Sequence, residues 1–320
     1  MSVQPRQNAL ARPDRDRLPL RGGRLPLVSV VIPTFDRRGP VRVAIDSVLA
    51  QSYAPVECVV VDDASTDGTA EFLDSQYGSR IVLIRNPVNR DKSFSRNAGV
   101  RSSTGAYICF LDSDDLLTKD SIERRMDLVL EAPNFEGVVF GLVERPQRVF
   151  DEQLARPSKG TPLTLRAYLE NPFMLHTNGI LARRQTILEY ARFNEGLTIR
   201  EDVEMFIRLL CHFELRSCGT VVARMRAVDR IRAHENYARI IAQGQAFSEA
   251  LVTDPLVASR IEPFLADIRA REELMLLRAL YHGGYGAEFR RRYRQAERAG
   301  VLNATWRWRR RYAMSFLGRG

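Results

Sequence analysis

Three carboxylates follow an apolar run in the first half of the chain. Residues 106–111 read Ala-Tyr-Ile-Cys-Phe-Leu, and Asp112, Ser113, Asp114 and Asp115 come directly after them. The apolar, β-favouring run is typical of a buried parallel strand. Carboxylates crowded at its end repel one another, and a divalent cation shared with a phosphate-bearing ligand would relieve that repulsion. The alternative is a solvated acidic turn that caps the next helix, since short Asp-x-Asp matches are common by chance.

The sequence around this cluster alternates between strand and helix patterns. We expect strands over residues 27–33, 56–61, 80–85 and 107–111, and helices over residues 41–50, 67–77, 93–102 and 119–130. This order predicts a parallel, doubly wound sheet with right-handed crossovers. Farther along, the patterns favour strands over residues 138–143 and 215–225, a helix over residues 201–211, and helices from about residue 238 onward.

Polar residues stand at several of the expected strand ends. In doubly wound sheets, ligands bind outside the carboxyl ends of the strands. Three such ends carry polar groups here, namely Thr34-Phe35-Asp36, Asp62-Asp63 and the Asp112 cluster. Because these ends share one rim, together they favour a metal and nucleotide site over an isolated acidic turn. Neither a Gly-x-Gly-x-x-Gly nor a Gly-x-x-x-x-Gly-Lys-Ser/Thr phosphate loop is present, so metal and basic side chains would have to neutralise a bound diphosphate.

Composition indicates a globular protein of the reduced intracellular compartment. The 320 residues are 45% hydrophobic and 27% charged, which suits one domain with additions. Four scattered cysteines include no Cys-x-x-Cys pair, so we expect a cytoplasmic location and no zinc site. Without an apolar run of about 18 residues or an apolar signal core, neither a membrane span nor secretion is expected.

The net charge of +9 is concentrated at the two ends of the chain. Residues 1–24 hold six Arg and two Asp, and residues 286–320 hold ten Arg and two Glu, which leaves the body slightly acidic. This distribution argues against nucleic acid bound along the body. We interpret residues 1–24 as a disordered basic arm. Aromatic residues interleaved with Arg in residues 286–320 suit contact with an anionic membrane surface. Nucleic acid could be bound by the same chemistry, and a solvated helix whose aromatics pack on the body is the further alternative.

Five blocks of sequence, in order, resemble the family 2 glycosyltransferases with the GT-A fold. The blocks are residues 28–37, 59–69, 95–108, 110–115 and 193–209. They correspond to the opening strand with its nucleotide-contacting turn, the base-recognition segment, the helix that feeds the metal strand, the DXD motif, and the acceptor segment with its ED motif. Two departures are minor: Phe35-Asp36 replaces the usual Tyr-Asn, and Ala64 replaces the usual Gly.

The resemblance implies an α/β fold and a domain layout. A GT-A domain with a Rossmann-like, mostly parallel sheet flanked by helices would occupy residues 25–235. Its nucleotide-sugar-binding half would be residues 25–117 and its acceptor half residues 118–235. Residues 236–320 would form a helical C-terminal region with the basic aromatic tail. The implied activity is hexosyltransferase-type: inverting, metal-dependent transfer of a sugar from a nucleotide-diphosphate sugar, with a UDP-sugar favoured, to a glycan or lipid-linked acceptor hydroxyl.

The resemblance also implies a donor site. The residues it assigns to nucleotide-sugar binding are Pro33, Thr34, Phe35, Asp36, Asp62, Asp63, Arg96, Asp112 and Ser113. Asp63, or its neighbour Asp62, would accept a hydrogen bond from N3–H of a uracil-like base, because a carboxylate is a strong acceptor. A helix-capping turn is the alternative for these two. Arg96 would approach the diphosphate or the ribose, unless it is an ordinary surface residue.

Metal and catalytic roles follow in the same way. Asp114 would be the main ligand of Mn2+ or Mg2+, Asp112 would act through the ribose or a metal-bound water, and His234 is a further candidate ligand unless it is a solvated loop residue. Asp115 is left unassigned. Asp202 would be the general base that takes the proton of the acceptor hydroxyl, and Glu201 would orient the site. The alternative for this pair is the general preference of carboxylates for a helix N-terminus.

Two other functions compete with this interpretation. A nucleotidyltransferase can share the α/β layout and the metal carboxylate, but it typically has a glycine-rich basic loop where this chain has residues 34–39. A non-catalytic, membrane-associated nucleotide-sugar-binding protein would not need Asp112, Asp114 and Asp202 together. We therefore expect a glycosyltransferase of cell-surface polysaccharide or glycolipid assembly, cytoplasmic or peripheral on the inner face of the cell membrane.

Overall fold

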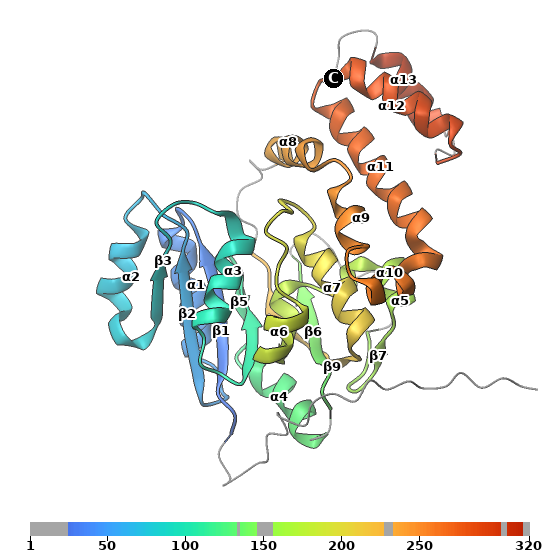
Figure 1. The fold of residues 1–320 in the computed structure, drawn as a ribbon. Helices are drawn as coiled ribbons and strands as arrows, with labels where there is room; N and C mark the ends of the chain where they lie inside the picture. The colour runs from blue at the N-terminus through green and yellow to red at the C-terminus, as the bar shows by residue number, and fades with distance from the viewer. Residues whose placement is uncertain (1–24, 133–134, 146–155, 227–232, 302–305, 316–320) are drawn as a thin grey trace, which may run out of the picture.

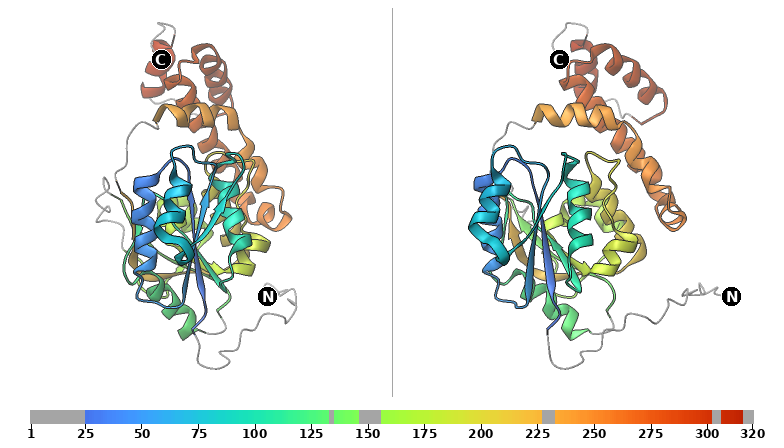
Figure 2. Two further views of the ribbon diagram at one scale, coloured as in Figure 1. Left: turned by 90° about the vertical axis from the view of Figure 1, so that its left-hand side faces the viewer. Right: turned by 60° about the vertical axis from the view of Figure 1, so that its left-hand side comes forward.

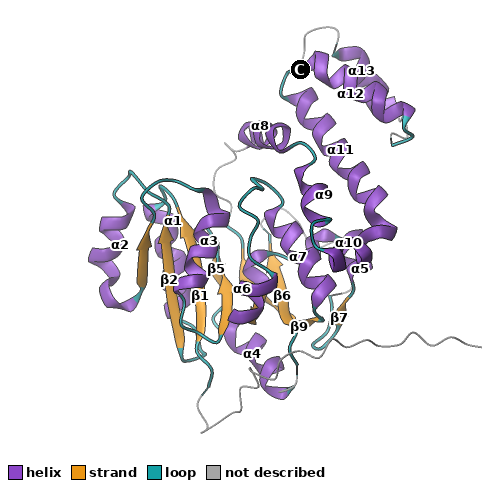
Figure 3. Ribbon diagram, in the orientation of Figure 1, coloured by secondary structure: helices purple, strands orange, loops and turns teal. Residues whose placement is uncertain are grey.

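The computed structural model describes residues 25–132, 135–145, 156–226, 233–301 and 306–315. The expected basic arm, residues 1–24, lies outside this part of the chain. A central sheet carries helices on both faces, and the C-terminal helices extend from one side of it (Figure 1). The colouring by secondary structure in Figure 3 shows this layering directly.

The first half of the sheet is parallel, as the alternating pattern predicts. Strands β1 (Val28–Thr34), β2 (Val56–Asp62), β3 (Val82–Arg85) and β4 (Tyr107–Phe110) lie in the order β3-β2-β1-β4. All neighbouring pairs among them are parallel. The connecting helices are α1 (Arg38–Leu49), α2 (Thr69–Tyr77) and α3 (Asp91–Ser102). Strand β1 is buried at every position, which explains its continuous apolar sequence.

The second half of the sheet mixes strand directions. Beyond β4 follow β8 (Ile180–Arg183), β6 (Val138–Glu144), β9 (Leu215–Arg224) and β5 (Leu116–Leu117). Strand β7 (Pro162–Leu163) pairs with the first two residues of β9. Strand β8 is antiparallel to both of its neighbours, whereas β6 and β9 are parallel. The α/β class is confirmed. Strands β5, β7 and β8 were not expected, because runs of two to four residues show no periodicity and form only against their partners.

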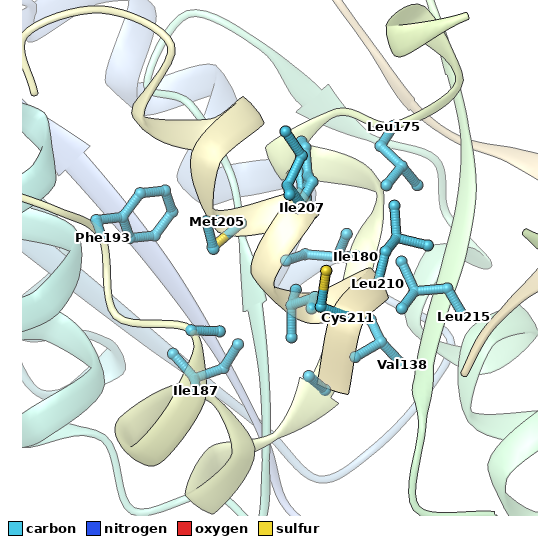
Figure 4. Close-up of a cluster of buried hydrophobic side chains, with 14 of the residues drawn as sticks. Val138, Leu175, Ile180, Ile187, Phe193, Met205, Ile207, Leu210, Cys211 and Leu215 are labelled. Carbon is cyan, nitrogen blue, oxygen red and sulfur yellow. The ribbon is translucent and has the colours of Figure 1, made fainter. Parts of the chain in front are cut away.

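The helices cover the sheet in two layers. Helices α1, α2 and α4 (Ser121–Glu131) pack on one face, and α3, α6 (Arg184–Tyr190) and α7 (Glu201–His212) pack on the other. Alternate residues of β1 serve the two cores: Val31 enters one, and Val30 and Ile32 enter the other. Figure 4 shows the core that contains Val31, in which side chains of α7 such as Leu210 pack near the strand residues Ile180 and Leu215.

Helix α3 lies unusually close to the sheet. A Cβ atom at Gly99 would lie 2.3 Å from Cγ1 of Val31 on β1, a separation that real contacts do not show. The glycine therefore fixes the distance between α3 and the strands. Because α3 also carries Arg96 and Asn97, this packing sets the position of the site residues described below.

The C-terminal helices divide between two cores. After α5 (Leu165–Glu170) and α7, the chain forms α8 (Ala233–Gln243), α9 (Ala246–Leu251), α10 (Pro255–Ile261), α11 (Leu265–His282), α12 (Gly286–Arg298) and α13 (Trp306–Met314). Phe247 and Val257 share the core of α7, whereas the second half of α11 packs with α12 and α13 in a core of its own. The domain boundary at residue 235 stays a prediction. No helix in the described part of the chain has the length and apolar character of a membrane span.

Substitution of Gly99 should expose the close packing of α3. Gly99→Ala must displace α3 or Val31, and overpacking of this kind typically costs about 1–3 kcal/mol of unfolding free energy. Gly39→Ala on α1 is the matched control, since no atom lies within 4 Å of a Cβ there. Urea denaturation should show a lower midpoint for Gly99→Ala only. Equal midpoints for the two variants would contradict the packing argument.

Candidate active site

The carboxyl ends of β1 and β2 meet at one rim, as expected. The backbone N–H of Asp63 donates to the carbonyl oxygen of Thr34 at 2.8 Å, which ties the two strand ends together. The loops beyond them are also joined: Asp36 N donates to Ser65 Oγ at 2.9 Å, and Thr66 N donates to Asp36 Oδ1 at 2.7 Å. In Figure 1 this rim is the upper edge of the sheet.

The predicted base-site residues differ in exposure. Pro33 and Thr34 are buried, whereas Phe35 is 43% exposed and Asp36 is exposed. Ala64 has a left-handed backbone with φ of 64°. Glycine adopts that region without strain, which is consistent with the glycine that the family resemblance leads one to expect at this place.

The two neighbouring aspartates of β2 are held differently. Asp63 accepts hydrogen bonds from Asn86 Nδ2 at 2.7 Å and from the backbone N–H of Arg90 at 3.1 Å. Asp62 is fully buried, accepts one bond from Ser65 N at 3.2 Å, and leaves Oδ1 without a partner in the described structure. Burial raises the pKa of Asp62, although the bonds from Ser65 oppose the shift. The choice between these two as base acceptor stays a prediction.

Asn86 is a site residue that our sequence analysis missed. It is 5% exposed, and Nδ2 also donates to Ser95 Oγ at 3.1 Å, so it links the end of β3 to α3. It directly follows an expected strand. The same rim argument that selected Asp62-Asp63 could therefore have identified it.

Arg96 lies at the centre of the site. It is 3% exposed, so an ordinary surface arginine is wrong. Its Nη2 lies 2.5 Å from Asp112 Oδ1, and its Nη1 lies 3.1 Å from Glu201 Oε1. Its guanidinium carbon lies 4.9 Å from the centroid of the Phe193 ring. This one side chain thus joins the acidic turn after β4 to the first turn of α7.

The charges around Arg96 stabilise one another. Burial alone would lower the pKa of Arg96, but the carboxylates of Asp112 and Glu201 raise it overall. Burial would raise the pKa of Asp112, but Arg96 and other cationic groups hold it at about 2. Lys92, which sequence reasoning missed, adds a contact of 2.6 Å from Nζ to Glu201 Oε1. Glu201, 1% exposed, therefore lies between two cations.

Asp115 does not face the rim. Its Oδ2 accepts from Asn178 Nδ2 at 2.7 Å, and its Oδ1 accepts from the backbone N–H of Arg226 at 3.1 Å. Burial and the nearby Asp112 raise its pKa to about 7. Asn178 Oδ1 also accepts from Asp112 N at 2.9 Å, so this amide fixes the whole acidic turn. No periodicity or strand signal marked Asn178 in the sequence.

The acidic turn offers few ligands for a metal ion. Asp112 and Asp114 have side chains 28% and 26% exposed, paired with Arg96 and Arg37. Among the described residues, no three His, Cys, Asp or Glu side chains could hold a metal ion by themselves. Mg2+ commonly takes one or two carboxylates and completes its shell with substrate phosphates. These residues therefore fit a cation brought together with a diphosphate, and they do not fit a cation held by protein alone.

His234 cannot be placed in the site. It belongs to the first turn of α8, but its side chain lies outside what the structure describes. His176, in contrast, is near the acidic turn. Burial lowers the pKa of His176, and the carboxylate of Asp112 partly opposes this shift.

The first turn of α7 carries three carboxylates with different surroundings. Glu204 is buried and bonded to Arg208 at 2.6 Å, and Glu201 is buried between cations. Asp202 keeps partial exposure, and its Oδ1 accepts from Val203 N at 2.8 Å. The charge of Asp202 contributes to the pKa shifts of both Arg96 and His176, so Asp202 lies near these two side chains. Asp202 is thus the carboxylate of this turn that remains available at the rim.

The C-terminal helices hold the loop before Asp202. Gln243 Oε1 at the end of α8 accepts from the backbone N–H groups of Thr198 at 3.1 Å and Ile199 at 3.0 Å. The guanidinium of Arg200 lies 3.6 Å from the centroid of the Phe247 ring on α9. Figure 1 shows α8 beside this loop. The sequence patterns gave no sign of these contacts.

Comparisons with known proteins identify the family and the fold. Residues 29–190 match the model of the family described as glycosyl transferase family 2. The succinoglycan biosynthesis protein ExoO of Rhizobium meliloti is 30% identical over 275 residues, which cover 80% of this chain and 78% of that protein. The Escherichia coli UDP-Glc:alpha-D-GlcNAc-diphosphoundecaprenol beta-1,3-glucosyltransferase WfaP is 32% identical over 31% of this chain and 40% of its own length.

A solved structure shares the architecture. S. aureus TarS 1–349 in complex with UDP-GlcNAc superposes with a TM-score of 0.62 at 16% identity, over 83% of this chain and 81% of that one. At this identity the likeness concerns the fold, which is therefore GT-A-like. With the family match spanning half of the sequence and the ExoO similarity spanning most of it, the chain belongs to glycosyl transferase family 2.

Proposed function

We propose that the protein transfers a sugar from a UDP-sugar to a hydroxyl of a glycan or lipid-linked acceptor during assembly of a surface polysaccharide or glycolipid. The observation that carries this proposal is the Arg96 bridge, which holds Asp112 and Glu201 within one ion-paired cluster. The relatives support the substrate class: ExoO is named for succinoglycan biosynthesis, WfaP for a UDP-glucose donor, and TarS was solved with UDP-GlcNAc.

The donor would lie across the rim formed by β1, β2 and β4. Asp62 or Asp63 would accept from the base, and Thr34 would line the ribose pocket, as assigned from the sequence. Basic side chains at the rim, including Arg37 and Lys92, would face the diphosphate. Mn2+ or Mg2+, held by Asp114 with support from Asp112, would supply Lewis-acid neutralisation of the departing nucleotide diphosphate.

Asp202 would act on the acceptor side. The acceptor hydroxyl loses its proton as its oxygen attacks the anomeric carbon, and a partly exposed carboxylate can take that proton. Glu201 is buried between Arg96 and Lys92, so it orients the cluster and is unsuited to proton transfer. Attack from the face opposite the nucleotide would invert the anomeric centre.

Because the chain belongs to a glycosyltransferase family, we no longer consider a nucleotidyltransferase activity. A non-catalytic role as a nucleotide-sugar-binding protein is tested by an assay for UDP release. Incubation with UDP-GlcNAc or UDP-glucose and Mn2+ should release UDP, with transfer to acceptor raising the rate. A protein that binds UDP but releases none from any UDP-sugar would favour the non-catalytic alternative. We expect the protein to act at the inner face of the cell membrane, where lipid-linked acceptors would be presented.

Replacement of Asp202 should remove the chemistry and keep the donor. Asp202→Asn is expected to lower transfer by about 10²- to 10⁴-fold, the usual contribution of a general base. UDP should still raise the thermal midpoint of the variant as it does for the wild type. Asp74→Asn, exposed on α2, serves as the charge-matched control. Near-normal turnover of Asp202→Asn would eliminate Asp202 as the base.

Metal binding should depend on the nucleotide. Because the described residues offer few ligands, calorimetry should show weak Mn2+ binding to the protein alone and tighter binding once UDP is present. EDTA should abolish transfer, and added Mn2+ should restore it. Tight Mn2+ binding without UDP, or full activity in chelator, would contradict the metal proposal.

A further inference from the structure

The aromatic residues of α12 do not form a lipid-facing surface. Phe289, Tyr293 and Ala296 are 0%, 3% and 4% exposed, and they pack against Leu276, Leu277 and Leu280 of α11. Their spacing of four and three residues places them on one face of the helix. The expectation that the aromatics of this helix meet a membrane is therefore wrong for Phe289 and Tyr293. The exposed residues of α12 include Arg291, Arg294 and Arg298, together with Gln295 and Glu297.

Among the described arginines of α12 and α13, some are paired with carboxylates and others line a groove. On α12, Arg291 Nε lies 2.8 Å from Glu288 Oε2, and Arg292 Nη1 lies 2.8 Å from Glu273 Oε2. Three others, Arg294, Arg298 and Arg309, line a groove of about 480 Å³ between α12 and α13. Within the described parts of the chain, none of these three forms a salt bridge.

The groove is built to present guanidinium groups. Its floor includes Tyr293 and Tyr312, whose ring centroids lie 4.7 Å apart. Arg294 Nε donates to Tyr312 Oη at 2.6 Å, which fixes that guanidinium against the floor. Glu297 is the carboxylate of the lining, so three positive charges face one negative charge. Guanidinium groups in this arrangement suit a phosphate, which they bind through paired N–H donors.

The position of the groove indicates the source of the phosphate. Both views in Figure 2 place α12 and α13 beyond α8, on the side to which the carboxyl ends of the parallel strands point. The groove is open, and its arginines are exposed together with the neighbouring Arg310. A planar anionic surface can approach such an open groove, and its lipids carry phosphate at the surface.

We propose that the groove lined by Arg294, Arg298 and Arg309 binds the phosphate of an anionic lipid headgroup, and so docks the molecule with its active-site side toward the membrane. The site differs from the DXD rim in elements and in chemistry. It requires no sugar transfer, so its test is independent of the proposed function.

Vesicle binding tests the proposal on the full-length protein. Vesicles of phosphatidylcholine with phosphatidylglycerol should bind the wild type at low salt, whereas vesicles of phosphatidylcholine alone should not. The double variant Arg298→Gln/Arg309→Gln should weaken binding by roughly ten- to thirtyfold, because each arginine close to an anionic membrane contributes strongly to the binding free energy. The control Arg291→Gln/Arg292→Gln removes the same charge from paired positions and should change affinity by less than about threefold. Circular dichroism should show that both variants are folded.

Each other outcome overturns the proposal. Equal weakening in the two variants would mean that net charge, and not the groove, drives binding. Absence of binding to anionic vesicles would exclude the membrane. Calorimetric binding of inorganic phosphate that the groove variant abolishes, without vesicle binding by the wild type, would identify a free-phosphate site instead.

Discussion

The buried guanidinium of Arg96 is the interaction on which the site depends. It contacts Asp112 on the proposed donor side and Glu201 on the proposed acceptor side. Arg96 and Glu201 are buried, and the side chain of Asp112 is 28% exposed. Burying a charge costs several kcal/mol unless partners satisfy it, so each of these groups is stable only with the others present. Arg96 reaches this position because Gly99 lets α3 lie against Val31 of β1. The close packing of α3 on β1 therefore determines where Arg96 lies in the candidate active site.

The acceptor side depends on a part of the chain outside the family match. That match ends at residue 190, before Asp202, and the loop leading to Asp202 is bonded to Gln243 of α8. Arg200, directly before the ED pair, packs on Phe247 of α9, which belongs to the same core as α7. Changes in α8 and α9 can therefore alter the loop that precedes Asp202, the proposed general base.

Sequence patterns predicted the helices and strands that can be recognised from their own residues alone. The continuous apolar runs of β1, β2 and β4 and the carboxylates after them were sufficient to place Asp63 and Asp112 at one rim. Strand β8 and Asn178 escaped notice because their roles exist only through pairing with distant segments. For Phe289 and Tyr293 the sequence left two interpretations open, because an apolar stripe among arginines looks the same whether it faces lipid or another helix. The structure shows that they pack on another helix.

Unfolding of Arg96 variants tests whether the ion pairs of Arg96 hold the site together. Arg96→Met leaves the buried Glu201 and the partly buried Asp112 without this cation, and urea denaturation should show a loss of about 3–5 kcal/mol of unfolding free energy. Adding Asp112→Asn and Glu201→Gln to the same chain removes those charges and should restore a large part of the loss. An Arg96→Met variant as stable as the wild type, or a triple variant no more stable than Arg96→Met, would show that Arg96 does not stabilise the carboxylates of Asp112 and Glu201.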